Sequence, residues 1–193
     1  MNTDKALRDL SLLAARLTLG ASIAAHGSQK MFGAFGGPGI EGVSQGFSSM
    51  GFEPGERYAR AASMAEIGSG TLIALGALGP VGPAMLISVM ITAIETAHRP
   101  KGFWAANGGY ELNVMYMLGA LLLATEGYGS LSVDALLGIH KKTNATLGWL
   151  ALAGGAVAAA IILGQRNVPL QQSSQQRQKT TEKNEVETRA TAS

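Results

Sequence analysis

The sequence contains no cysteine, only 15% charged residues and only 6% aromatic residues. Without cysteine, thiol nucleophiles, disulfide bonds and thiolate metal sites are excluded. Soluble domains carry about 25% charged residues, so the low charge content points away from that class. The net charge is +2, but the basic residues are scattered rather than grouped into a patch. We therefore expect no nucleic-acid partner.

What the chain does contain is a series of apolar segments separated by glycine-rich or polar connections. Helices are expected at residues 10–25, 57–78, 84–97, 111–125 and 146–163. The segment 34–56, rich in glycine and proline, is expected to be a loop at the membrane surface. Within the first helix, Gly20, Ala24 and Ser28 recur every four residues, a pattern that lets another helix approach closely.

These segments predict an all-α fold, a polytopic membrane helical bundle. Its four-helix core is expected at residues 1–137, and a connection followed by a fifth transmembrane helix at residues 138–164. Residues 165–193 have almost no large apolar side chains, so we expect a disordered polar tail. A soluble bundle is the alternative, but it requires polar stripes that residues 146–163 lack. A cleaved signal peptide is a second alternative, although Arg16 interrupts its apolar region.

Two stretches of the chain share one outline. His26 to Gly37 and His98 to Gly109 both follow an apolar segment, and with one-residue gaps both read His, Lys, x, Phe, x, Ala, Gly-Gly. Five spans orient the first and third helices the same way, so both stretches reach one membrane face. The resulting polar cluster is predicted to contain His26, Lys30, His98, Lys101 and Glu111.

Charged residues inside the apolar segments are expensive in lipid, so Arg16, Glu66 and Glu95 are expected to point inward and pair. The structural interpretation is a salt bridge between Arg16 and Glu66 that joins two helices. Each histidine could likewise simply donate to a carbonyl. As a pair on one face, however, His26 and His98 also suit proton transfer or binding of a quinone carbonyl.

Metal binding is not predicted. Glu95-x-x-His98 matches half of the di-iron pattern of helical bundles, but the second copy is missing because Ile23 lies three residues before His26. A haem between His26 and His98 would need both rings at one depth inside the bundle, whereas both are expected at helix ends.

Several motifs occur in a fixed order along the chain. They are His26-Gly27-x-x-Lys30, Glu66 inside the second helix, His98-x-x-x-Gly102-Phe103, Gly108-Gly109-x-Glu111 and Gly127-x-Gly129-x-Leu131-Ser132-x-Asp134. This series resembles the DoxX family over about residues 12–137. The family positions carried over are His26, Gly27, Lys30, Glu66, His98, Gly109, Glu111 and Asp134. The fifth helix and the polar tail after Asp134 depart from the family pattern.

The resemblance implies a four-helix membrane core linked to redox chemistry, since the family takes its name from a subunit of a thiosulfate:quinone oxidoreductase. The first functional prediction is a quinone-linked oxidoreductase subunit with catalytic residues His26, Glu66, His98 and Glu111. The residues expected to hold the quinone are His26, Lys30, His98 and Lys101, and the structural motif positions are Gly27, Gly109 and Asp134.

Two further functions stay open. The second is a non-catalytic membrane anchor or assembly partner of a redox enzyme or respiratory complex, and the third is a small-molecule or proton transporter. Each places the chain as a multi-pass protein of the cell (inner or plasma) membrane, in contact with membrane lipid.

Overall fold

A computed structural model describes residues 3–138 and 145–167. The predicted connection at 139–144 and most of the predicted tail, 168–193, lie outside the described residues. The described helices are α1 (Thr3–Phe32), α2 (Gly39–Ser49), α3 (Gly55–Leu75), α4 (Val81–Ala93), α5 (Glu111–Glu126), α6 (Val133–Leu136) and α7 (Ala145–Gly164). Those ranges contain no strand, and the all-α membrane helical bundle is confirmed.

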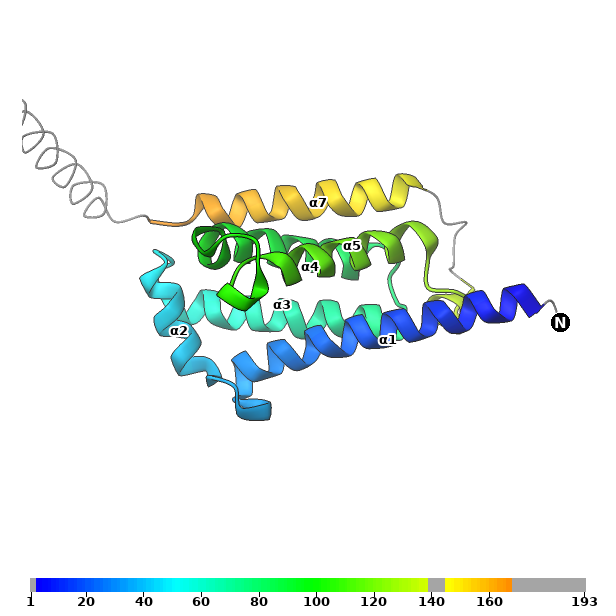
Figure 1. Ribbon diagram of the computed structural model, residues 1–193, viewed down its shortest axis with the longest axis horizontal. Coiled ribbons are helices and arrows are strands. Elements are labelled where there is room, and N and C mark those ends of the chain that lie inside the picture. The colour runs from blue at the N-terminus through cyan, green and yellow to red at the C-terminus, as the bar shows by residue number, and fades with distance from the viewer. Residues whose placement is uncertain (1–2, 139–144, 168–193) are drawn as a thin grey trace, which may run out of the picture.

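Helices α1 and α3 form one half of the bundle and pack with their backbones in contact (Figure 1). A Cβ atom at Gly20 would collide with the Gly70 carbonyl, and one at Gly27 would lie 2.7 Å from the carbonyl oxygen of Ser63. Gly70 in turn leaves no room for a Cβ beside Ala24. The predicted small-residue face is thus confirmed at Gly20 and Ala24, because only small residues permit this approach.

Helices α4, α5 and α7 form the other half, so α7 is an integral part of the bundle. Gly155 of α7 lies against Ile87 of α4, and Gly148 lies against Thr125 of α5. One apolar core runs through both halves. Its buried members are Ile23, Ile73, Leu86, Ile87, Met90, Ala120, Leu123, Ala124, Tyr128 and Ala151.

Three described helices are long and apolar enough to cross a membrane: Thr3–Phe32, Val81–Lys101 and Ala145–Gly164. The second of these extends α4 through a π-helical turn at Ile94–His98 and a 3₁₀ turn at Arg99–Lys101. The α3 helix buries the polar residue Glu66, and α5 has only 16 residues. Five spans therefore remain a prediction, in which α3 and α5 cross as packed members of the bundle.

The prediction of a loop over residues 34–56 is wrong in its middle, where α2 forms. This helix lies across one end of the bundle and packs against α3 (Figure 1). Its apolar residues Ile40, Val43 and Phe47 follow helical spacing, but glycines lower the helix propensity and hide that spacing. The turn after α2 is held by the segment that follows α7, because the Asn167 N–H donates to the Gly51 carbonyl at 2.7 Å.

The directions of the helices agree with the prediction. Helices α1 and α4 run the same way and both end beside α2, whereas α5 runs opposite to them (Figure 1). The first helix is longer than expected at both ends, since it spans Thr3–Phe32 rather than residues 10–25. His26 and Lys30 lie on the last turns of α1, at the end of the helix where the sequence motif places them.

Candidate functional site

A buried ion pair joins α1 to α3 near the α2 end of the bundle. Lys30 Nζ lies 2.5 Å from Glu66 Oε1, and the side chain of Glu66 is only 1% exposed. The second carboxylate oxygen, Glu66 Oε2, is buried and has no hydrogen-bond partner among the described residues. A buried carboxylate oxygen without a donor is costly. Among the described residues one other buried side-chain atom lacks a partner, Arg16 Nε, and Arg16 already donates through both of its terminal nitrogens.

The predicted salt bridge between Arg16 and Glu66 is wrong, because each residue has another partner. Arg16 is buried and donates to the carbonyl oxygens of Ala74 and Leu131. Ala74 lies in the last turn of α3, where carbonyls lack helical partners and the helix dipole favours a cation. The Arg16 side chain thus completes the end of one helix and fixes a loop, and it leaves Glu66 to Lys30.

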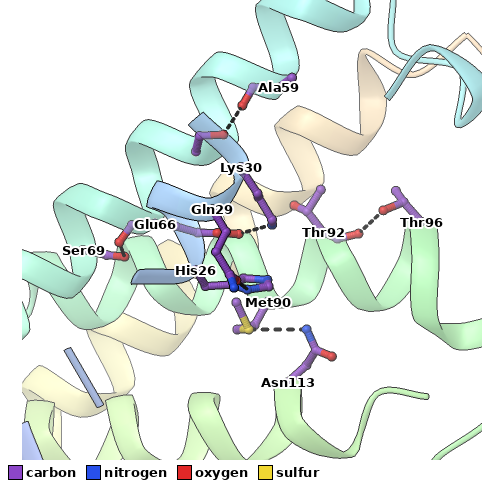
Figure 2. A network of polar contacts seen from close by, with 11 residues as sticks. His26, Gln29, Lys30, Ala59, Glu66, Ser69, Met90, Thr92, Thr96 and Asn113 are labelled. Carbon is purple, nitrogen blue, oxygen red and sulfur yellow. Dashed lines mark hydrogen bonds and ion pairs between the residues drawn. The ribbon is translucent and has the colours of Figure 1, made fainter. Parts of the chain in front are cut away.

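Three further side chains surround the Lys30–Glu66 pair from other helices. Figure 2 shows His26 of α1 close to Met90 of α4 and Asn113 of α5. Asn113 is 8% exposed and donates its amide to Met90 Sδ at 3.4 Å, a weak acceptor. The exposed ring of His26 makes one hydrogen-bond contact, between its Nδ1 and Gln29 Oε1 at 3.2 Å. Four helices therefore bring polar or polarisable groups to one place.

Sequence reasoning found His26, Lys30 and Glu66 but missed Asn113, Gln29 and Met90. Asn113 carried a usable signal, because it is a lone amide within the otherwise apolar first turns of α5. An amide inside such a segment needs a hydrogen-bond partner within the bundle. The role of Met90 depends on its place beside Asn113, which no spacing in the sequence reveals.

The second predicted stretch has a different environment from the first. His98 Nδ1 lies 2.7 Å from the Gly108 carbonyl oxygen, and Glu111 Oε2 accepts from the Ala105 N–H at 2.9 Å. Both side chains thus hold the loop between α4 and α5. Gly109 packs against the backbone of this loop, where a Cβ would not fit, and Lys101 is exposed with its stem lying across Gly108.

Glu95 does not point inward as predicted. Its side chain is 38% exposed and pairs with Arg99, one turn further along, at 2.6 Å. A contact of this kind on an exposed helix surface contributes little to stability. Within the described residues no group of three or more His, Cys, Asp or Glu side chains could hold a metal ion.

The opposite end of the bundle contains a second set of polar contacts, which we call the clasp: Asp9, Arg16, Tyr128, Ser130 and Asp134. Asp134 accepts from the backbone N–H groups of Leu78 and Gly79 at 2.9 and 2.8 Å. Both of these residues have positive φ angles, of 60° and 52°. Asp134 therefore fixes the strained turn that begins α4, which accounts physically for a family position that the sequence left without a role.

The remaining members of the clasp also bind the chain itself. Asp9 accepts from both the N–H and the hydroxyl of Ser130, and the Tyr128 hydroxyl donates to the Gly79 carbonyl at 2.7 Å. Burial raises the pKa of the Tyr128 hydroxyl above its usual value, and the nearby Asp134 carboxylate acts in the same direction. The clasp lines a cavity of about 620 Å³ at this end of the bundle.

Comparison with known proteins agrees with the motifs described above. The family model described as DoxX matches residues 11–99, which run from α1 through the end of α4 and include His26, Lys30, Glu66 and His98. Over these residues the chain matches the DoxX family. The family match ends before α5, so it does not cover Asn113, the clasp residues 128–134 or α7.

One similar protein is an uncharacterized protein of Haemophilus influenzae, which is 32% identical over 79 residues. That alignment covers 41% of this chain and 50% of the relative, so it spans about half the relative's length. No solved structure matches the chain. The DoxX match and the three apolar helices long enough to cross a membrane support a membrane protein, and the chemistry of the Lys30–Glu66 site has to be argued from its geometry.

Proposed function

We propose that this DoxX protein is a multi-pass protein of the cell (inner or plasma) membrane that binds a quinone at the Lys30–Glu66 site, as the quinone-linked subunit of an oxidoreductase. The single observation that carries the proposal is the buried Glu66 Oε2 without a hydrogen-bond donor. A polar group of this kind inside a membrane bundle is expensive and typically marks a functional site.

The residues present fit the head group of a quinone. Its oxidised form offers carbonyl oxygens, and the Lys30 ammonium is a donor whose side chain is still 23% exposed. Its reduced form offers hydroxyl groups, and Glu66 Oε2 is an acceptor without a donor. The His26 ring, one turn before Lys30 on α1, adds a further polar group, and the Asn113 amide lies beyond Met90. When bound, a quinone supplies reversible transfer of two electrons and two protons.

The roles of the chain's own residues follow from their exposure. Glu66 is buried and hydrogen-bonded by an ammonium, so it can orient a ligand hydroxyl and accept its proton. His26 is exposed one turn before Lys30, and its ring nitrogens can accept and donate a proton, so it can carry that proton to the surface. His98 and Glu111 act indirectly, because their side chains bind the backbone of the loop between α4 and α5.

Electrons must be supplied by a partner, because the chain has no cysteine and its described residues include no metal-binding cluster. A role as membrane anchor of a redox enzyme is therefore compatible with quinone binding. The exposed aromatic residues near the α2 end, Phe32, Phe35 and Trp104, favour such a docking role as a second function. They suit either the lipid interface or the surface of a partner.

The test is purification in mild detergent from native membranes, followed by mass spectrometry of bound lipids and proteins. We expect quinone with the wild-type protein and with Glu56→Gln, whose carboxylate lies on an exposed surface. Glu66→Gln should fold, because the amide retains an acceptor for Lys30, but should lose the quinone. Wild-type protein that contains no quinone but a stoichiometric redox protein would contradict the proposal and support the anchor.

A further inference from the structure

A contact between α1 and α5 lies near the middle of each helix. Leu19 of α1 packs against Gly119 of α5, where an added Cβ would lie 3.3 Å from a Leu19 methyl group. The two helices run in opposite directions (Figure 1). Because the helices are antiparallel, a residue about two turns closer to the end of α1 lies opposite a residue about two turns closer to the start of α5. After two turns each helix again presents the same face to the other.

At that second level the facing residues are exposed. His26 lies about two turns after Leu19 on the same face of α1, and Leu112 lies about two turns before Gly119 on the same face of α5. His26 is exposed and Leu112 is 57% exposed. Their neighbours deeper in the bundle, Met90 and Asn113, are only 3% and 8% exposed. The two helices thus touch at Leu19 and Gly119 and part at His26 and Leu112.

On this basis we propose that the site opens sideways into the bilayer between His26 and Leu112, and that its ligand is an amphiphile taken from the lipid. This inference rests on the proposed function and specifies its substrate class. The polar head of the ligand lies at Lys30 and Glu66, and its long apolar tail leaves between α1 and α5. A water-soluble redox carrier that enters across the loop between α4 and α5 is not the ligand.

Chemistry at the opening supports a lipid-side entrance. Leu112 and Met115, which is 51% exposed, offer apolar contact for a tail at the start of α5. The polar residues His26 and Lys30 lie one turn apart on one face of the last turns of α1 (Figure 2). An entrance with apolar rim and polar interior matches a ligand that has one polar end.

The experiment uses the full-length protein in phospholipid vesicles with a benzoquinone that carries a photoreactive group on a long alkyl tail. After irradiation, labelled residues are mapped by mass spectrometry, with and without excess unlabelled quinone. We expect competable labelling near His26 in α1 and near Leu112–Met115 in α5. Leu112→Trp should abolish it by filling the opening. Leu122→Trp, at a 63% exposed position beyond the Gly119 contact, should leave it unchanged.

Different outcomes separate the two proposals. Competable labelling of α2 or of residues 102–109 would overturn the lateral entrance while leaving quinone binding intact. No competable labelling anywhere in the wild-type protein would overturn both. Leu112→Ala serves as a second variant that cannot block the opening. Leu112→Ala should retain the labelling. If the Trp and Ala variants lose the labelling equally, Leu112 is needed for folding, and filling of an entrance does not explain the loss.

Discussion

The two ends of the bundle use polar side chains in different ways. In the clasp, Asp9, Asp134 and Tyr128 direct every hydrogen bond described above toward the chain itself, and the two terminal nitrogens of Arg16 do the same. At the α2 end, the Lys30–Glu66 pair leaves one buried carboxylate oxygen without a donor. Satisfied groups stabilise the fold, whereas a buried unsatisfied atom needs an explanation. Arg16 Nε, the unsatisfied atom in the clasp, belongs to a guanidinium that is already fixed through its two terminal nitrogens, whereas the Glu66 carboxylate has a single partner. The comparison separates structural residues from candidate ligand-binding residues.

The largest expected effect is on the clasp. Arg16→Met removes two charge-assisted hydrogen bonds and leaves the Ala74 and Leu131 carbonyls buried without donors, so it should lower the free energy of unfolding by about 3 kcal/mol or more. Thermal unfolding in detergent measures the loss. Arg57→Met, at an exposed position of α3, is the matched control. If the two variants unfold alike, Arg16 does not hold the clasp together.

Asp134→Asn should have the next largest effect. The amide can accept from only one of the two N–H groups of Leu78 and Gly79, and its own NH₂ then faces the other donor. We expect a loss of about 2 kcal/mol in the free energy of unfolding, with bound quinone unchanged in the protein that remains folded. If Asp134→Asn lost its bound quinone while its stability stayed that of the wild type, the clasp would not be purely structural and the two ends would not differ in role.

Tyr128→Phe should cost about 1 kcal/mol, because it removes the hydrogen bond to Gly79. The effect depends on pH in a definite direction. The pKa of Tyr128 is raised in the folded protein, so its contribution is complete below the unfolded value of about 10 and is lost as pH rises above it. Unfolding compared at pH 8 and above pH 10 should show an alkaline loss in the wild type that the variant lacks.

The smallest effects on stability distinguish the two histidines. His98→Ala removes a hydrogen bond to the loop carbonyl of Gly108 and should lower the free energy of unfolding by about 1 kcal/mol. His26→Ala should leave stability near that of the wild type but weaken quinone binding, because its ring is exposed at the site. Quinone content and thermal unfolding of both variants provide the measurement. Identical behaviour would restore the prediction that the two histidines form one functional pair.

The sequence predicted the elements better than their contacts. Apolar segments and small-residue spacing located the α1, α3, α4, α5 and α7 helices and the α1–α3 contact, because these depend on local composition. The partner of Arg16 could not be predicted, since a backbone carbonyl such as that of Ala74 leaves no mark in a sequence. The repeat predicted equal roles for His26 and His98, but both end helical segments and only the His98 side chain binds a loop carbonyl, that of Gly108. Asn113 was visible as an isolated amide, and only the fold gave it neighbours.

The central claim is that the Lys30–Glu66 pair is kept for a ligand rather than for stability. The decisive measurement is thermal unfolding together with quinone content for Lys30→Met and for the double variant Lys30→Met/Glu66→Met. Lys30→Met alone leaves a buried carboxylate without its cation, so stability should fall by about 3 kcal/mol. Replacing both residues by apolar ones removes the unpaired charge and should restore stability. We predict that the double variant is as stable as the wild type and contains no quinone. A double variant that retains quinone, or that remains as unstable as the single variant, would contradict the account.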